Sequence, residues 1–234
     1  MKPSNKKITV ILFGPPGAGK GTQASLLAEK LSLYYLETSK IIEESFNKAK
    51  KNDFIKVGKE KYLLSNEKKL WKAGILCSPP FVAQLVKNKI NELFKAGESL
   101  VLAGSPRTLY EGKEVNPLLK KLYGKENIKV VLIKLKGADS IFRNSHRRIC
   151  ELMRHPILYN KETIHLTRCP LDGSKLMKRK GLDDPETIKI RLKEYEERTF
   201  PLVKLFKKQG LKVKEVFGSG SVAQVFNDIL KAIK

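Results

Sequence analysis

Residues 14–22 of the chain read Gly14-Pro15-Pro16-Gly17-Ala18-Gly19-Lys20-Gly21-Thr22. They follow the phosphate-binding pattern G-x-x-x-x-G-K-[ST], except that Gly21 separates Lys20 from Thr22. Glycines let successive backbone N–H groups converge on phosphate oxygens, and a helix that begins beside the lysine directs the positive end of its dipole there. Lys20 can bridge the β- and γ-phosphates of a nucleotide, and Thr22 can hold magnesium or its water. The alternative is a Gly/Pro-rich turn with an incidental lysine.

The residues on either side of this loop favour the phosphate-binding interpretation. Residues 8–13, Ile-Thr-Val-Ile-Leu-Phe, are β-branched or apolar on both faces, which is typical of a strand buried in a parallel sheet. Residues 23–31 then place apolar side chains at helical spacing. Strand, glycine loop and helix follow in the order that the motif requires, so an incidental turn is the weaker hypothesis.

The rest of the chain alternates strand-like and helix-like segments. Further buried strands are predicted at residues 100–103, 130–134 and 212–217. This alternation predicts an α/β fold in which helices flank a parallel sheet. Residues 150–180 contain prolines and glycines without a sustained period, and we expect an inserted excursion there. Two apolar strips at helical spacing predict core-facing helices: Leu63, Leu64, Leu70 and Trp71, and then Val222, Val225, Phe226, Ile229, Leu230 and Ile233.

Composition bounds the class of protein. With 234 residues, 41% of them hydrophobic, the chain can bury a core as one α/β domain with smaller insertions. Its apolar runs are far shorter than the roughly 20 residues that span a bilayer. Three cysteines are too few for a disulfide framework, which favours a cytoplasmic protein.

The net charge of +23 would attract polyphosphates, nucleic acids and anionic membranes alike. Lysines are spread through every segment, and they are not interleaved with arginines and aromatic residues as on many nucleic-acid-binding surfaces. A solvated basic surface is therefore the favoured interpretation, and recruitment of a polyanion is the alternative.

The segment from Gly14 to Gln23 resembles the opening of the adenylate kinase family of nucleoside monophosphate kinases. Three later segments resemble motifs of that family in the same order: Gly104-Ser105-Pro106-Arg107-Thr108 (G-F-P-R-T), Arg143 with Arg147 and Arg148 (R-x-x-x-R-R), and Asp183-Asp184-Pro185-Glu186-Thr187 through Arg191-Leu192 (D-D-x-x-E-T-x-x-x-R-L). The resemblance implies a P-loop NTPase fold: one kinase domain over residues 1–234, with a monophosphate-binding insertion at 37–66 and a lid at 144–182.

The resemblance also implies roles for particular residues. ATP would be bound by Gly17, Ala18, Gly19, Lys20, Gly21, Thr22 and Arg143; the monophosphate by Thr38, Gly104, Arg107 and Glu111; and catalysis would rest on Lys20, Arg107, Arg147 and Arg191. Arg107 would grip the monophosphate, Arg143 would stack on the base of ATP, and Arg147 with Arg191 would clamp the transferring group. Phosphoryl transfer requires positioned positive charge, and the planar guanidinium fork supplies it. For any one arginine the alternative is a surface ion pair.

Several positions depart from the family pattern. Ala103 stands where the family usually has an aspartate that organises magnesium-bound waters. Glu43 replaces a phosphate-binding arginine, and a carboxylate beside a phosphate is unfavourable, although Lys40 can substitute in part. Glu111 replaces a glutamine that reads adenine, and an ionised carboxylate accepts hydrogen bonds without donating them. AMP is the acceptor that the resemblance favours, and other monophosphates remain open.

The lid resembles the zinc-binding lid of some family members. Cys150, Cys169 and Asp172 would supply three ligands, but Met153 stands where a second cysteine is expected, with His155 and His165 nearby as replacements. A closed zinc site needs four ligands. The alternative is a metal-free lid held by packing, for which the candidate residues are Ile157, Leu158, Leu166 and Leu176.

Two functional hypotheses follow. The first is a monomeric, magnesium-dependent enzyme that transfers the γ-phosphoryl group of ATP reversibly to a nucleoside monophosphate, most simply ATP + AMP = 2 ADP, and whose lid closes over both nucleotides. The second is a catalytically weakened nucleotide-binding or scaffold protein of the same fold, with RNA as a partner for its basic surface. The joint presence of Lys20, Thr22 and the four arginines favours the enzyme. We expect no membrane partner and no nucleic-acid partner.

Overall fold

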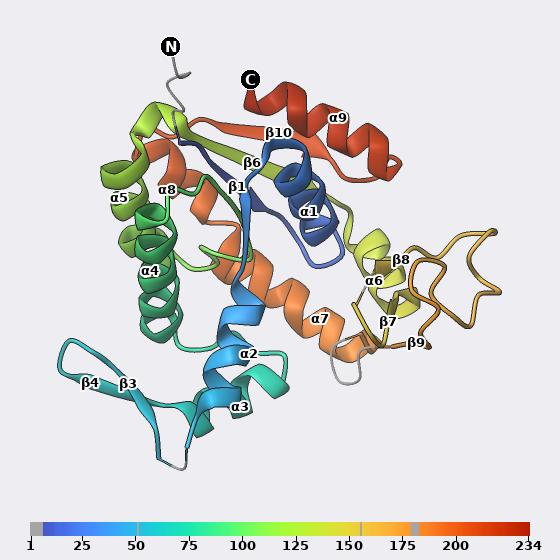
Figure 1. Ribbon diagram of the computed structural model, residues 1–234, viewed down its shortest axis with the longest axis horizontal. Helices are drawn as coiled ribbons and strands as arrows, with labels where there is room; N and C mark the ends of the chain where they lie inside the picture. Colours follow the sequence, from blue (N-terminus) through green and yellow to red (C-terminus); the bar gives the residue numbers. More distant parts are fainter. Residues whose placement is uncertain (1–6, 51, 155, 179–182) are drawn as a thin grey trace.

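A computed structural model describes residues 7–50, 52–154, 156–178 and 183–234. A five-stranded parallel sheet forms its centre, in the order β10-β6-β1-β5-β2 (Figure 1). The strands are β1 (Thr9–Phe13), β2 (Tyr34–Glu37), β5 (Leu100–Ala103), β6 (Ile128–Lys134) and β10 (Val213–Phe217). The α/β class and the four strands predicted from the sequence are thereby confirmed.

Within the five-stranded sheet, the strand that the sequence did not predict is β2, which lies at the edge. It has four residues, of which only Leu36 is buried, while Tyr34 is exposed. An edge strand with one covered face lacks the continuous apolar run that identifies β1, whose five residues are all buried.

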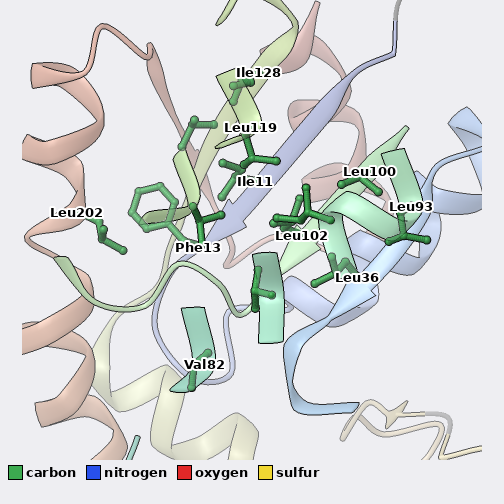
Figure 2. Close-up of a cluster of buried hydrophobic side chains, with 14 of the residues drawn as sticks. Ile11, Phe13, Leu36, Val82, Leu93, Leu100, Leu102, Leu119, Ile128 and Leu202 are labelled. Atoms are coloured by element: carbon green, nitrogen blue, oxygen red, sulfur yellow. The ribbon is translucent and has the colours of Figure 1, made fainter. Parts of the chain in front are cut away.

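Alternate side chains of the sheet enter two separate cores. Ile11 and Phe13 of β1 belong to a cluster that includes Leu119 and Leu202 from the helices on one face (Figure 2). Val10 and Leu12 point to the other face. Helices α4 (Pro79–Lys95), α5 (Leu109–Tyr123) and α8 (Leu202–Lys208) cover the first face, and α1 (Lys20–Leu31) and α9 (Val222–Ile233) cover the second (Figure 1). The predicted C-terminal amphipathic helix is thus confirmed as α9.

The first excursion from the sheet contains a hairpin that the sequence did not predict. The excursion comprises α2 (Thr38–Lys48), β3 (Phe54–Val57), β4 (Glu60–Leu63) and α3 (Leu64–Lys72). The hairpin formed by β3 and β4 projects at the lower left of Figure 1. Gly58, with a φ of 60°, permits the tight turn between the strands. The expected helical strip was wrong for Leu63, because this residue ends β4 with 40% of its surface exposed, whereas Leu64 is buried in α3.

The second excursion carries a small antiparallel sheet of order β8-β7-β9. It follows α6 (Gly137–His146) and comprises β7 (Arg148–Cys150), β8 (Pro156–Ile157) and β9 (Leu176–Met177). Ile157 and Leu176 pack with Cys150 and Cys169, as expected for a packed lid, but Leu158 is 55% exposed and does not belong to that cluster. The chain returns to the central sheet through α7 (Pro185–Glu194) and the π-helical turn Tyr195–Thr199. Elsewhere in the chain, a short 3-10 helix (Lys125–Asn127) precedes β6.

Over the described ranges of the chain, no helix is both long enough and apolar enough to cross a membrane.

Candidate active site

The phosphate-binding loop joins the end of β1 to the start of α1. Gly17 and Gly19 have φ values of 76° and 82°, in the left-handed region that glycine adopts without strain. A β-carbon on Gly14 would lie 2.2 Å from the carbonyl oxygen of Ile133, so the chain leaves β1 tightly against β6. Within the described parts of the chain no side chain caps the N-terminus of α1, which leaves its first N–H groups directed at the space that a phosphate would fill.

Helix α6 holds this loop from behind. Ser140 Oγ donates a hydrogen bond to Pro16 O at 2.6 Å, and Asn144 Nδ2 donates to Ser140 O at 2.7 Å. A β-carbon on Gly17 would lie 2.5 Å from Asn144 Nδ2. The helix that carries Arg143 is therefore in close contact with the loop.

Lys20 turns back onto its own loop. Its Nζ donates to Gly14 O at 2.8 Å and to Pro15 O at 2.7 Å. Burial, together with the smaller effect of the charges of Arg107 and Arg191, lowers the pKa of Lys20 from its ordinary 10.5 to about 7. Three cationic side chains thus lie close enough to repel one another, which is the electrostatic setting of a polyanion site.

A cavity of about 240 Å³ opens between the loop and the first excursion. Of the residues predicted for the site, it brings together Lys20, Thr38, Gly104, Arg107, Glu111 and Arg191. The topology explains why they meet: β1 and β5 are parallel neighbours, so the loops that follow them lie at the same edge of the sheet.

Arg107 approaches this cavity over a glycine. Gly104 has a φ of 104°, and a β-carbon there would lie 2.9 Å from Arg107 Nη2. Burial lowers the pKa of Arg107, while the carboxylate of Glu111 acts in the opposite direction. A side chain at position 104 would displace the guanidinium.

Thr38 lines the same cavity with a hydroxyl group that lacks a hydrogen-bond partner among the described residues. The residue is 3% exposed. A buried hydroxyl without a partner is destabilising, and a ligand in the cavity can supply the missing bond.

Two of the positions that depart from the family pattern, Glu43 and Glu111, also line the cavity, whereas Ala103 does not. Lys40 Nζ lies 3.4 Å from Glu37 Oε2, and Ser39 Oγ donates to Glu37 Oε1 at 2.8 Å. The side chain of Glu43 reaches the same wall. Lys40 is therefore paired with Glu37.

Two predicted arginines lie outside the cavity. Arg147 makes a two-pronged ion pair with Asp183: Nη2 to Oδ1 is 2.6 Å and Nε to Oδ2 is 3.3 Å. The side chain of Asp183 is only 1% exposed, so this pair ties the base of the second excursion to the start of α7. Arg143 is half-buried on α6. Neither arginine lines the cavity, and neither does Thr22.

Arg154 and Trp71 are among the residues that line the cavity without having been predicted for it. Arg154, with a φ of 57°, reaches it from the second excursion, and its place in an irregular segment gave no periodic signal. Trp71 was expected to pack only. It does pack against Phe46, with ring centroids 6.2 Å apart, and it also forms part of the cavity wall.

The three predicted metal ligands of the second excursion lie together. One ligand atom from each of Cys150, Cys169 and Asp172 falls within 4.8 Å of the others. Cys150 Sγ donates to Asp172 Oδ2 at 3.0 Å, and Asp172 Oδ1 accepts from the N–H and the hydroxyl of Ser174. These hydrogen bonds hold the pKa of Asp172 well below its usual range. His165 is not part of this group, and His155 lies outside the described residues.

Comparison with known proteins bears on the whole chain. The model of the adenylate kinase family matches residues 12–211. A protein named adenylate kinase from Methanothrix thermoacetophila is 32% identical over 228 residues, which cover 97% of this chain and 98% of that protein. Another adenylate kinase, from Clostridium botulinum (strain Loch Maree / Type A3), is 33% identical over 224 residues, covering 94% of this chain and 95% of the relative. An adenylate kinase from Petrotoga mobilis is 29% identical, over 96% of this chain and 97% of its own length.

Proposed function

Because this chain belongs to the adenylate kinase family, we propose that it transfers the γ-phosphoryl group of ATP reversibly to a nucleoside monophosphate, with AMP as the preferred acceptor (ATP + AMP = 2 ADP). One observation carries the proposal: Lys20, Arg107 and Arg191 line a single cavity that also holds the unpartnered hydroxyl of Thr38. Convergent cations beside a helix N-terminus suit a reaction whose transition state spreads negative charge over phosphate oxygens.

In this proposal, one set of residues binds ATP and another set binds the acceptor. Lys20 exchanges the carbonyl oxygens of Gly14 and Pro15 for β- and γ-phosphate oxygens, while the N–H groups of the loop hold the remaining phosphate oxygens. Arg107 binds the phosphate of the acceptor, and Thr38 donates a hydrogen bond to the acceptor. Arg191 neutralises the group in transit.

The second excursion completes the site from the ATP side. In this proposal residues 144–182 act as the lid, and residues 37–66 hold the monophosphate. Arg143 contributes from α6, which is braced against the phosphate loop, and Arg147 joins it when the lid covers the nucleotides. Closure excludes water, which would otherwise accept the phosphoryl group.

Magnesium would be the metal ion of the reaction. Adenylate kinases generally use this ion, and it retains several waters and binds largely through phosphate oxygens. Thr22, half-buried in the first turn of α1, is the residue that would hold it or one of its waters, because Ala103 at the end of β5 offers no carboxylate. When bound, the ion offsets the charge of the β- and γ-phosphates.

We also propose that the protein works as a monomer in the cytoplasm. The scattered cysteines suit a reducing compartment. Size-exclusion chromatography with light scattering tests the oligomeric state, for which a mass near 26.5 kDa is expected.

The test is ADP formation from ATP and magnesium with AMP, GMP, CMP, UMP or dAMP as the acceptor. Turnover should be highest with AMP and should collapse in Lys20→Ala and in Arg107→Ala. Lys30→Ala is the matched control, because Lys30 is an exposed lysine in the last turn of the same helix as Lys20. ATP binding without transfer to any acceptor would refute the kinase and favour a nucleotide-binding scaffold.

A further inference from the structure

We infer that Glu111 is a positioning residue: it fixes the backbone from which Arg107 reaches the cavity, and the base of the acceptor is read by other residues. The inference rests on the proposed function, because it assigns Arg107 to the acceptor phosphate. It differs from what the sequence suggested for Glu111, namely direct contact with the nucleotide.

Glu111 binds three donors of the loop that precedes its own helix. Its Oε2 accepts hydrogen bonds from Ser105 Oγ at 2.9 Å and from the backbone N–H of Arg107 at 3.1 Å. Its Oε1 accepts from Thr108 Oγ1 at 3.1 Å. The backbone N–H of Glu111 donates in turn to Thr108 Oγ1 at 3.2 Å. One side chain therefore ties the residues at positions 105, 107 and 108 to the first turn of α5.

This arrangement extends an ordinary helix cap. Thr108 is the N-cap of α5, and Glu111 is the third residue of the helix, as in a capping box. In a capping box the carboxylate would accept from the N–H of the N-cap residue. Here it accepts from the N–H one residue earlier, that of Arg107, so the bond serves the site as well as the helix end.

Burial and charge make the arrangement specific. Glu111 is 2% exposed, and burial raises the pKa of its carboxyl, while the N–H of Arg107, the two hydroxyls and the guanidinium of Arg107 act to lower it. Its charge in turn opposes the effect of burial on the pKa of Arg107. Removal of the carboxylate would leave buried donors unpaired and would take away the carboxylate with the largest effect on the guanidinium of Arg107.

The same contacts leave little capacity for a nucleotide base. A carboxylate offers about four lone-pair sites, and donors of the protein already occupy three of them. The ionised group also has no donor for a ring nitrogen. Glu111 is thus placed to act through Arg107, whose side chain lies over Gly104 at the cavity.

The kinetic test is a double-mutant cycle with Glu111→Ala and Arg107→Ala across the five acceptors. Glu111→Ala should lower kcat/KM roughly 10- to 100-fold, because small displacements of a binding group have effects of that size. The reduction should be equal for every acceptor, and the double variant should match Arg107→Ala within about 2-fold. KM for ATP should be unchanged.

Glu111→Gln is the conservative variant that separates positioning from base reading. Its amide oxygen can still accept from Ser105 and from the N–H of Arg107, and its NH₂ group can donate to Thr108 Oγ1, so a small loss shared by all acceptors is expected. If position 111 reads the base, the glutamine should instead favour AMP and dAMP over the others, because an amide can both donate to and accept from adenine.

Two further readouts do not depend on turnover. The backbone N–H of Arg107 can be followed by NMR, and its exchange with solvent should quicken in Glu111→Ala but hardly in Glu111→Gln. Trp71, the single tryptophan of the chain, lines the cavity, so its fluorescence reports binding of AMP without ATP. Glu111→Ala should weaken that binding, while a thermal melt checks that the variant is folded.

The inference is overturned if Glu111→Ala changes the ranking of acceptors, if its effect adds to that of Arg107→Ala, or if exchange of the Arg107 N–H is unaltered. Absence of turnover in the wild-type protein would count against the proposed kinase instead. In that case the exchange measurement still decides whether Glu111 holds Arg107.

Discussion

Lys20 contributes to the site both as a charge and as a hydrogen-bond donor. Its Nζ donates to two carbonyl oxygens of its own loop, those of Gly14 and Pro15. A buried ammonium beside two guanidinium groups is poorly stabilised, which is why its pKa falls to about 7. The triphosphate of ATP reverses that balance, because an adjacent anion favours the protonated lysine. Binding of ATP and protonation of Lys20 should therefore be coupled.

We expect the affinity for ATP to fall as pH rises from 7 to 9. Above about pH 7 the unliganded lysine is largely neutral, so each binding event must take up a proton, and the dissociation constant should rise by up to tenfold per pH unit. Titration calorimetry in two buffers of different ionisation enthalpy measures the uptake directly. Lys20→Arg is the control, because arginine stays charged and should remove the pH dependence that Lys20 causes. Equal proton uptake by the two proteins would contradict the coupling.

Thr38 offers a second test at the residue scale. Thr38→Val removes a buried hydroxyl without a partner, so it should raise the free energy of unfolding of the ligand-free protein by about 1 kcal/mol. KM for the monophosphate should rise severalfold at the same time. Thr9→Val is the matched control: the hydroxyl of Thr9 is also buried without a partner among the residues that the structure describes, but Thr9 lies in β1 and does not line the cavity. Thr9→Val should change stability only, and a rise in KM in both variants would contradict a contact with the substrate.

The cavity residues that sequence could predict were those in continuous motifs. Lys20 follows from its glycine loop, and Arg107 and Arg191 follow from segments that resemble the family. Arg154 and the inward role of Trp71 could not be predicted, because irregular segments have no period and a partly buried aromatic side chain gives the same pattern in a core and in a cavity wall. The hydrogen bonds of Glu111 could not be predicted from the sequence either. Its partners Ser105, Arg107 and Thr108 are set by the path of the loop between β5 and α5.

At the scale of elements, α6 couples the phosphate loop to the second excursion. One hydrogen bond, from Ser140 to Pro16 O, joins the helix to the loop. We expect Ser140→Ala to raise KM for ATP severalfold and to lower the free energy of unfolding by about 1 kcal/mol, with little change in KM for the monophosphate. Ser145→Ala is the control, because the hydrogen bonds of the Ser145 hydroxyl within the described residues, to Ile141 O, Phe142 O and His146 Nδ1, all stay within α6. An equal rise in both KM values would contradict a specific role in holding the loop.

The cysteine–aspartate group in the second excursion predicts a weak metal site at best. Among the residues that the structure describes, three ligand atoms come together, from Cys150, Cys169 and Asp172, whereas structural zinc is almost always held by four; Asp172 already accepts hydrogen bonds from Cys150 and Ser174. Incubation with EDTA should therefore leave the melting temperature unchanged, and elemental analysis should find zinc well below one equivalent. Stoichiometric zinc together with a lower melting temperature after chelation would show that a fourth ligand completes the site.

Elements with strong local signals were predicted, and the remainder depend on tertiary context. β1 and α1 follow from a buried apolar run and a glycine loop, and α9 from its amphipathic spacing. The β3–β4 hairpin was missed because its outer face carries both Phe54 and Lys61, so alternation does not separate apolar from polar residues. Its turn residue, Gly58, was the signal that was overlooked.

On the scale of the whole molecule, the parallel sheet brings together the loops that follow β1 and β5, and the two excursions extend from it in different directions (Figure 1). A net charge of +23 surrounds this arrangement, and only a few of its cations line the cavity. The remaining lysines affect nucleotides at a distance, through a field that dissolved salt screens over about 10 Å at 0.1 M.

This distribution predicts how activity depends on ionic strength. Between 50 and 500 mM KCl, kcat/KM for ATP and for the monophosphate should fall, because screening weakens attraction during encounter, while kcat should hold, because the buried contacts of Lys20 and Arg107 are screened far less. Replacing Lys59, Lys204 and Lys212 by glutamine should reduce the slope of kcat/KM against salt without changing kcat, since none of the three lines the cavity. If kcat falls in parallel with kcat/KM, salt acts on the closed complex instead. If the triple variant keeps the full slope of kcat/KM against salt, the attraction of nucleotides comes from the cavity alone. The lysine-rich surface would then have another partner. Inhibition of the kinase by RNA at low salt is the direct assay for such a partner.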